Sequence, residues 1–484
     1  MVGIMVAVLA AAMVFPAMLD AAEGDGESAS AFFISSILGM FIGGATALVN
    51  RGPVDSITPR TAFVLTVGAW LALSICAALP LRLAGEGLSW TDAFFEAVSG
   101  LTTTGATVIT GLDYRPEGLL LWRAILQWIG GIGIIVTAMA FWPMLGIGGM
   151  QLFQLETGDK SDKILPRATQ IAASISLIYL ILTLICFFAF MAVGMDWLHA
   201  ICHAMSTLST GGFSASDNSM GNYVHMGADI ITTIFMILAS LPFVLFIVAI
   251  RGKPVALWRD AQVRGFLLVV TVATAFLTVL LWMTGAHEEG GAIRQAAFNS
   301  VSIITGTGFA TADYGAWGPI SQAAFFVFMF IGGCAGSTTC SVKIFRYQIA
   351  GTAMRRYLAK LLRPNAVIPM HYNGRIVDEK TLHSVLGFFF VFFGMISIFK
   401  VIIAVYAITA AILSAMGMDT VSALSGAATS LTNTGPGLGP IIGPSGTFAP
   451  LSDPEKWLLT FNMFIGRLEV IAVLVFLSPR FWRN

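Results

Sequence analysis

The stretch Ile303–Asp313, which reads I-I-T-G-T-G-F-A-T-A-D, decides the fold because related stretches occur three more times in the chain. The other copies are L-T-T-T-G-A-T-V-I at Leu101–Ile109, L-S-T-G-G-F-S-A-S-D at Leu208–Asp217 and L-T-N-T-G-P-G-L-G at Leu431–Gly439. Four copies at similar spacing form an internal repeat, so we expect four versions of one structural unit. Aligning the copies places one glycine of each in register, namely Gly105, Gly212, Gly308 and Gly435.

The composition is that of a membrane protein. Hydrophobic residues make up 57% of the chain and charged residues only 11%, with a mean hydropathy of +0.84. Because soluble domains carry about 25% charged residues, we expect an all-α polytopic membrane protein. The formal net charge is zero, which gives no reason to expect a nucleic acid as partner.

Long apolar segments flank each of the four stretches, and a helix that crosses a membrane needs about 20 mainly apolar residues. Residues 1–50 precede the repeats and contain two candidate spans, Val2–Leu19 and Ala31–Val49. After them a unit recurs in which a long apolar span, a short amphipathic segment, a Thr/Gly strand and a second long span follow one another. We predict four such units, and ten spanning helices in all, with the units at residues 61–145, 166–250, 263–345 and 382–478.

The short segment inside each unit has about 12 residues, too few to cross a membrane. Irregular backbone at membrane depth persists only when it is buried in protein or faces a water-filled cavity. We therefore predict four re-entrant pore helices around one shared cavity that holds the Thr/Gly strands. The pore helices are predicted at Trp90–Thr103, Trp197–Ser209, Ala292–Ile304 and Asp419–Ser430. The spans that follow them are predicted at Leu119–Leu145, Ala228–Ile250, Ala323–Phe345 and Trp457–Leu477.

Lysine and arginine concentrate in the links on one side of this ten-span arrangement. The stretch Lys343–Lys380 alone contains eight basic residues. Because basic links stay on the cytoplasmic side of a membrane, we predict that both termini and the link at residues 346–381 are cytoplasmic. The four pore helices then all enter the membrane from outside.

The Thr/Gly strands have the chemistry of a cation filter. A dehydrated cation needs several oxygen dipoles around one axis, and main-chain carbonyls supply them without a fixed charge. Glycine reaches the required dihedral angles at low cost, and each pore helix directs its partially negative C-terminal end toward the cavity. The alternative, extracellular turns in a packed bundle, leaves the shared preceding helix unexplained. The predicted ion-binding residues are Thr104, Gly105, Gly211, Gly212, Thr307, Gly308, Thr434 and Gly435. The predicted flanking residues are Thr103, Ala106, Thr210, Phe213, Gly306, Phe309, Asn433 and Pro436.

The second span of the third unit is interrupted by I-G-G-C-A-G-S-T-T-C-S-V-K at residues 331–343. Glycines and hydroxyl residues in the middle of a span destabilise a helix. The segment is therefore either a loop inside the membrane or a packing face of small residues.

Arg467 lies near the middle of the last predicted span, in F-N-M-F-I-G-R-L-E-V. A charge at this depth is costly, which suggests a function, although a structural role bonding loop carbonyls is compatible with the same position. An ion pair with Glu469 is not expected on a straight helix, because residues two apart do not face each other. Lys400 also falls within a predicted span, and the sequence assigns it no role.

With these motifs, the chain resembles the Trk/Ktr/HKT superfamily of potassium transporters over essentially its whole length, most of all the bacterial TrkH members. The resemblance rests on T-T-T-G-A-T, S-T-G-G-F-S, T-G-T-G-F-A-T and N-T-G-P-G-L-G at the four strands. It implies a pseudo-tetrameric pore like that of potassium channels, with K+ bound at the filter only and no organic cofactor. Gly105 implies a preference for potassium, whereas Ala106 and Pro436 depart from the usual Gly-Phe pattern and imply moderate selectivity. The resemblance also implies a gate below the filter, at Gly332, Gly333, Gly336, Ser337, Thr338, Lys343 and Arg467.

The resemblance further implies partners and a location. It predicts a homodimer in the lipids of a bacterial inner membrane. It also predicts that the link at residues 346–381 contacts a cytosolic TrkA-like regulatory subunit that binds NAD or ATP. This chain contains no Walker motif and no G-x-G-x-x-G after a strand, so nucleotide sensing belongs to that partner.

We therefore predict potassium translocation through a four-strand filter, passive or coupled to another ion. The alternatives are a sodium- or proton-coupled cation carrier of another kind and a weakly selective monovalent cation channel. A membrane enzyme is not expected. The histidine pair His199 and His203 lacks the glutamate of an H-E-x-x-H motif, and no nucleophile motif occurs.

Overall fold

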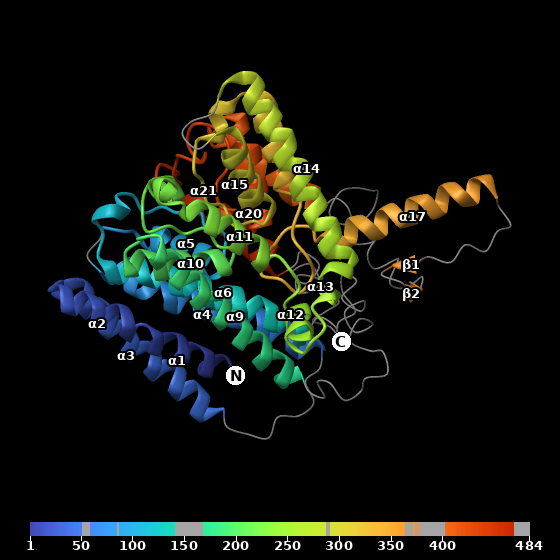
Figure 1. Ribbon diagram of the computed structural model, residues 1–484. Helices are drawn as coiled ribbons and strands as arrows, with labels where there is room; N and C mark the ends of the chain where they lie inside the picture. Colours follow the sequence, from blue (N-terminus) through green and yellow to red (C-terminus); the bar gives the residue numbers. More distant parts are fainter. Residues whose placement is uncertain are drawn as a thin grey trace.

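A computed structural model describes residues 1–50, 59–84, 87–140, 168–286, 291–363, 371–372, 375–376 and 402–468. Apart from one small hairpin, all regular secondary structure in these residues is helical. The hairpin pairs β1 (His371–Tyr372) with the antiparallel β2 (Arg375–Ile376). This arrangement confirms the predicted all-α fold class (Figure 1).

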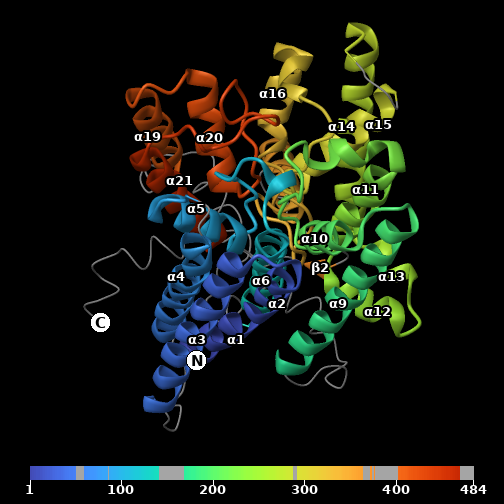
Figure 2. The same cartoon turned by 90° about the vertical axis from the view of Figure 1, so that its left-hand side faces the viewer.

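The N-terminal residues form a helical hairpin. α1 (Val2–Ala12) and α2 (Val14–Glu23) together are long and apolar enough to cross a membrane, and α3 (Gly26–Val49) returns beside them. Figure 2 shows α1 and α3 packed against α4 (Pro59–Leu83), the first helix of the first unit. Buried Asp20 accepts hydrogen bonds from Ser28 Oγ and from the backbone N–H of Gly118, both at 2.6 Å. The hairpin is thereby fixed to the helix that follows the first Thr/Gly strand.

The first helices of the other units are α9 (Ala168–Ala192), α14 (Ala261–Thr284) and α19 (Ile402–Ala415). By length and composition, the described residues contain five helices that could cross a membrane, or six if one bent pair is included. The other predicted spans are broken, short or continue outside the described residues. The prediction of ten spans therefore stays a prediction.

The pore helices begin and end close to the predicted residues. They are α5 (Trp90–Leu101), α10 (Trp197–Leu208), α15 (Ala292–Ile304) and α20 (Thr420–Thr432). Side chains of Ser89, Asp196 and Asp419 cap three of them by accepting a hydrogen bond from a first-turn N–H, which satisfies donors that a helix leaves free. Buried apolar side chains form one cluster around α4 and α5, one around α9 and α10, and one between α14 and α15.

The helices that follow the Thr/Gly strands differ from unit to unit. They are α6 (Glu117–Ala140), α11 (Ala228–Ala239), α16 (Pro319–Phe328) and α21 (Asp453–Arg467). The 3-10 turns η1 (Leu112–Tyr114), η2 (Ser219–Met226) and η3 (Tyr314–Trp317) precede the first three of them.

The single span predicted over Ala228–Ile250 is wrong. The chain breaks at Ser240–Pro242 and continues as α12 (Phe243–Ile250), before the short α13 (Val255–Arg259). Pro242 has no N–H to donate, and its ring disfavours a helical conformation for the residue before it. The sequence S-L-P carried this signal, but the apolar residues around it concealed the break.

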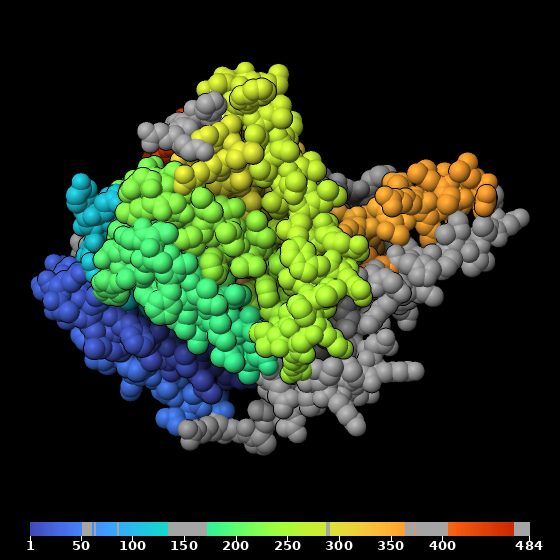
Figure 3. Space-filling view, in the orientation of Figure 1, coloured from blue at the N-terminus to red at the C-terminus, as the bar shows by residue number. Residues whose placement is uncertain are grey.

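In the link predicted at residues 346–381, the described residues as far as Leu362 form a helix. α17 (Ile344–Leu362) projects from the body of the protein, as Figures 1 and 3 show in orange, and the β1–β2 hairpin follows it. Residues such as Ala353, Met354 and Leu358 favour a helix here. Lys400 and Glu469, which fall within predicted spans, lie outside the described residues.

Candidate functional site

The four Thr/Gly strands meet in a closed ring. A Cβ atom added to any register glycine would lie too close to a main-chain carbonyl oxygen of the next strand. The last strand contacts the first in the same way, so the order of contacts runs around the ring and closes. Each glycine is paired with the residue whose carbonyl oxygen it meets. The pairs are Gly105 with Gly211, Gly212 with Thr307, Gly308 with Thr434, and Gly435 with Thr104.

The strands share one backbone conformation. The register glycines have φ between 78° and 101°, a region that residues with a side chain rarely adopt. Two residues earlier each strand has another positive φ, which is 52° at Thr103, Thr210 and Asn433 and 69° at Gly306. For a β-branched threonine this conformation is strained, so its presence in two strands indicates that the surrounding structure imposes it.

This second positive φ ends each pore helix in the same way. In the first unit, the N–H of Thr104 donates to the carbonyl of Ser99 at 2.9 Å, five residues back. This is the bond of a Schellman motif, which turns the chain sharply out of a helix. The helix ends therefore all direct their carbonyls toward the ring. The equivalent bonds are Gly211 to Ser206 at 2.9 Å, Thr307 to Ser302 at 2.8 Å and Thr434 to Thr429 at 3.1 Å.

Hydroxyl pairs reinforce three of the strands. In the first strand, the Oγ1 atoms of Thr102 and Thr104 lie 2.7 Å apart, and the third and fourth strands have matching pairs. The second strand has Gly211 at the corresponding position, and Gln127 of α6 takes over there. Its Nε2 donates to the carbonyl of Gly211 at 2.6 Å, and its Oε1 accepts the N–H of Phe213 at 3.0 Å. Because a carbonyl oxygen has two lone pairs, that of Gly211 can still accept a second partner.

A buried ion pair supports the first strand from behind. Glu96 of α5 accepts hydrogen bonds at 2.9 Å from Thr107 Oγ1 and from the N–H of Val108, just beyond the ring. Nε of Arg123 lies 2.8 Å from Glu96 Oε1, and both side chains are almost fully buried. Arg123 also donates to the carbonyl of Ser214 at 2.8 Å, so the pair connects the first strand with the second.

The other units use different side chains behind the ring. His203 of α10 lies 2.9 Å from Ser214 Oγ through its Nε2. Asn299 of α15 donates to Thr311 Oγ1 at 2.9 Å, and Ser425 of α20 accepts the N–H of Leu438 at 2.8 Å. Each support therefore holds the chain where it leaves the ring.

A small cavity of about 80 Å3 opens where the chain leaves the ring. The register glycines Gly105, Gly212 and Gly308 line it, together with the flanking residues Ala106, Phe213 and Pro436. The fourth flanking residue at this level, Phe309, is buried and packs 5.9 Å from His203, ring centre to ring centre. Under the predicted topology, this cavity is the outer mouth of the ring.

The predicted gate segment is a compact hydrogen-bonded loop between α16 and α17. The N–H of Gly332 donates to the carbonyl of Val342 at 2.9 Å, and that of Gly333 to Thr339 Oγ1 at 3.1 Å. Ser337 Oγ donates to the carbonyl of Cys334 at 2.6 Å. Lys343 Nζ donates to the carbonyl of Thr339. The loop is thus an ordered element rather than an extended linker.

The loop fills the break between α11 and α12. The carbonyl of Gly336 accepts the N–H of Phe243 at 3.0 Å. In return the carbonyl of Ser240 accepts the N–H of Cys334 at 2.9 Å, and Thr338 Oγ1 donates to the carbonyl of Ala239 at 3.1 Å. Backbone groups that the broken helix leaves free are therefore satisfied by the loop.

Arg467 joins this loop to the first unit. Its side chain is buried, with Nη1 2.8 Å from Cys340 Sγ and Nη2 donating to the carbonyl of Gly130 at 2.7 Å. Within the described residues its Nε has no hydrogen-bond partner. A Cβ atom on Gly306 would lie 3.9 Å from the backbone nitrogen of Cys340, so the loop lies against the start of the third strand.

Comparison with known proteins agrees with this architecture. A model of the TrkH family, described as cation transport protein, matches residues 28–484. The chain belongs to the TrkH family. The Trk system potassium uptake protein TrkI of Halomonas elongata is 42% identical over 480 residues, which cover 99% of this chain and 95% of the relative. The Trk system potassium uptake protein TrkG of Escherichia coli is 32% identical over 97% of this chain and 95% of the relative.

A solved structure of the family has the same fold. The crystal structure of the potassium transporter TrkH from Vibrio parahaemolyticus matches with a TM-score of 0.89 and 34% sequence identity, over 100% of this chain and 98% of that chain. This TrkH-family chain is therefore an integral membrane protein, and its characterised relatives are transport proteins.

The sequence analysis missed the layer behind the ring in this TrkH-family member. Glu96, His203 and Asn299 each occupy the ninth position before a register glycine, so a repeated polar position was visible in the sequence. Gln127 and Arg123 carried no such signal, because they lie on α6 and reach the strands only in the folded protein.

Proposed function

We propose that this protein takes up potassium ions through the ring of four strands. The observation that carries the proposal is the closed order of contacts, in which each register glycine lies against a carbonyl oxygen of the next strand. Such a ring can replace the water around a dehydrated cation by oxygen dipoles. The names of the relatives, which are potassium uptake proteins, support potassium as the ion.

In this proposal the filter consists of the four register glycines and the residues just before them, and K+ is bound there only. The carbonyl oxygens act without a fixed charge, so the ion can leave as readily as it enters. The residues are Thr104 and Gly105, Gly211 and Gly212, Thr307 and Gly308, and Thr434 and Gly435. The chain itself uses no organic cofactor.

The loop and Arg467 act as the gate. A buried guanidinium repels a cation strongly because screening is weak away from water. Arg467 is buried beside Cys340, and the loop that carries Cys340 lies against the third strand. Displacement of the loop would move the hydrogen-bonding partner of Arg467 and open the inner side of the ring.

We further propose that the protein works as a homodimer in a bacterial inner membrane, with both termini in the cytoplasm. The β1–β2 hairpin and the exposed face of α17 would then contact a cytosolic TrkA-like subunit that binds NAD or ATP. The position of α17, which projects from the body of the protein (Figure 3), supports a contact of this kind.

The deciding experiment is uptake of radioactive rubidium into proteoliposomes that contain the purified chain. We expect external potassium to suppress uptake strongly and sodium to suppress it weakly. Equal suppression by both ions would instead identify a weakly selective cation channel. A strict requirement for a sodium or proton gradient would identify a coupled carrier.

Arg467→Ala tests the gate in the same assay. Removal of the buried charge should raise rubidium flux, while Arg467→Lys should retain most of the block. A flux that is unchanged in folded Arg467→Ala protein would contradict the barrier.

A further inference from the structure

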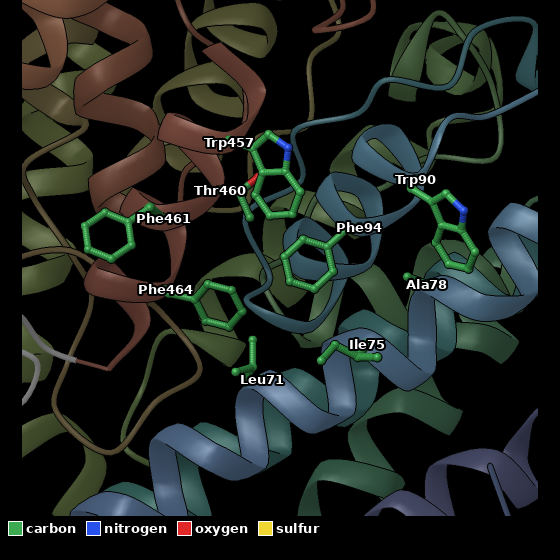
Figure 4. Close-up of a pocket in the computed structure, with 9 residues that line it drawn as sticks. All are labelled: Leu71, Ile75, Ala78, Trp90, Phe94, Trp457, Thr460, Phe461 and Phe464. Carbon is green, nitrogen blue, oxygen red and sulfur yellow. The ribbon is translucent and has the colours of Figure 1, made fainter. Parts of the chain in front are cut away.

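An apolar groove lies outside the ring, between α4, α5 and α21. Its volume is about 490 Å3, and Figure 4 shows the side chains that line it. α4 contributes Leu71, Ile75 and Ala78, which face the groove at intervals of one turn. α21 contributes residues from Trp457 to Phe464 on the opposite wall. Seven residues along a helix cover about 10 Å, so the groove follows both helices for about that length.

The walls of the groove offer almost no hydrogen-bonding partner. Thr460 is the polar residue among those that line its α21 wall, and its hydroxyl already donates to the carbonyl of Lys456 at 2.7 Å. A water molecule needs two or more polar partners to remain in such a space. Because α4 is one of the helices able to cross a membrane, the groove opens toward hydrocarbon and suits a hydrocarbon chain.

One end of the groove has the features of a lipid headgroup region. Trp90 and Trp457, 58% and 49% exposed, stand at this end, and tryptophans concentrate at the membrane–water interface. The guanidinium of exposed Arg82 lies 5.8 Å from the centre of the Trp90 ring. The neighbouring cation, Lys456, is paired with Asp92 at 2.6 Å. Arg82 is therefore placed to bind an anion at headgroup depth.

We propose that the groove binds one acyl chain of a phospholipid whose phosphate is held by Arg82. The argument for a phospholipid, rather than for a second protein surface, is the combination of an apolar groove, interfacial tryptophans and a cation at the end where a phosphate would lie. Binding does not depend on which ion the protein carries.

The consequence for transport rests on the proposed function. Phe94 faces the groove and packs against Trp457 and Phe464, with ring centres 5.2 Å and 6.4 Å apart. Phe94 lies two residues before Glu96, which holds the first filter strand, and Phe464 lies one turn before Arg467. An acyl chain in the groove would therefore support the outer faces of the two helices that carry these residues.

The test uses a phosphatidylglycerol with a photoreactive group near the end of one acyl chain. The purified full chain is placed in phosphatidylcholine nanodiscs with a small fraction of this probe and illuminated, and labelled peptides are identified by mass spectrometry. We expect labelling to concentrate on residues 71–78 of α4 and 457–464 of α21.

Two matched variants decide whether the groove is the binding site. Ile75→Trp fills the groove. Ile181→Trp makes the same change on α9, outside the groove, at a residue of comparable exposure: Ile181 is 43% exposed and Ile75 is 53% exposed. Labelling of the groove should be lost in Ile75→Trp and unchanged in Ile181→Trp. Labelling that survives in Ile75→Trp, or that is equally strong on the exposed face of α9, would overturn the proposal.

Arg82 provides the headgroup test. In Arg82→Gln, more unlabelled phosphatidylglycerol should be needed to displace the probe, and Arg82→Lys should restore the wild-type value. If the same amount of phosphatidylglycerol displaces the probe from the wild type, Arg82→Gln and Arg82→Lys, Arg82 does not bind the phosphate and that part of the proposal is wrong. Crosslinks between two copies of the chain through the groove would show that a second copy covers it and would also overturn lipid binding. Labelling is read without ion movement, so a failure of rubidium uptake and a failure of lipid binding are separate results.

Discussion

The ring has the same backbone conformation in all four units, whereas the side chains that support it from behind differ from unit to unit. The four strands of the ring repeat one conformation, with register-glycine φ angles within a range from 78° to 101°. The supports behind them are an ion pair, a histidine, an asparagine and a serine. Oxygens that surround one axis must lie at similar distances from it, so the ring tolerates little variation. A support has only to satisfy the hydrogen bonds of the strand it holds, and many side chains can do this.

The largest effect is expected from Gly308→Ala, which alters the ring itself. The new Cβ would collide with the carbonyl of Thr434, and φ at this position is +86°. Because neither strand can move without displacing the next, we expect rubidium uptake to fall to background. Gly227→Ala is the matched control, since its φ is +81° but no atom lies within 4 Å of the added Cβ.

Gly227→Ala should lose about 1–3 kcal/mol of stability from backbone strain and should keep most of its uptake. If both variants lose rubidium uptake equally, backbone strain alone explains the loss, and the contact between neighbouring strands of the ring is not required for uptake.

The next effect is expected from Glu96→Gln, which breaks the ion pair behind the first strand. Arg123 would remain buried without its carboxylate, a change that costs about 3–5 kcal/mol. We expect a lower Tm and a smaller preference for potassium over sodium in the rubidium competition assay.

The double variant Glu96→Gln with Arg123→Met should recover part of the stability, because removal of both charges is often nearly neutral. A double variant as unstable as the sum of its two single changes would show that the two side chains act independently.

A smaller effect is expected from Gln127→Met. This change removes the pair of hydrogen bonds between Gln127 and the second strand, which has no counterpart at the other described strands. The N–H of Phe213 and the carbonyl of Gly211 would each lose a buried partner, at a cost of about 1–3 kcal/mol. Selectivity should fall while total uptake persists. Unchanged selectivity in a destabilised variant would limit Gln127 to a structural role.

The smallest effect is expected from Ser425→Ala. This change removes the hydrogen bond that Ser425 Oγ accepts from the N–H of Leu438 and the one that it donates to the carbonyl of Leu438, which lies beyond the ring. Because Ser422 Oγ also donates to that carbonyl, the change should cost about 1 kcal/mol. The Tm should fall slightly with no change in the ratio of potassium to sodium suppression. A clear change in that ratio would mean that the layer behind the ring sets selectivity as strictly as the ring does.

Much of the fold could be predicted because each repeated unit is defined by residues that lie close together in the sequence. The pore helices follow from a capping residue, about three turns of helix and a Thr/Gly end, and the structure places α15 at the predicted residues Ala292–Ile304. The break at Ser240–Pro242 was missed because apolar residues continue on both sides of it. α17 was missed because its basic residues were interpreted only as a cytoplasmic link.

The sequence by itself determined the membrane-protein class, the fourfold repeat and the glycines in register, because each depends on composition or on residues close together in the chain. Only the tertiary structure decided that the strands close into a ring, that Gln127 and Arg123 reach them from α6, and that Arg467 bonds to the loop at Cys340. These contacts join residues that are far apart in sequence. No local pattern records them, because their geometry exists only once the helices have packed.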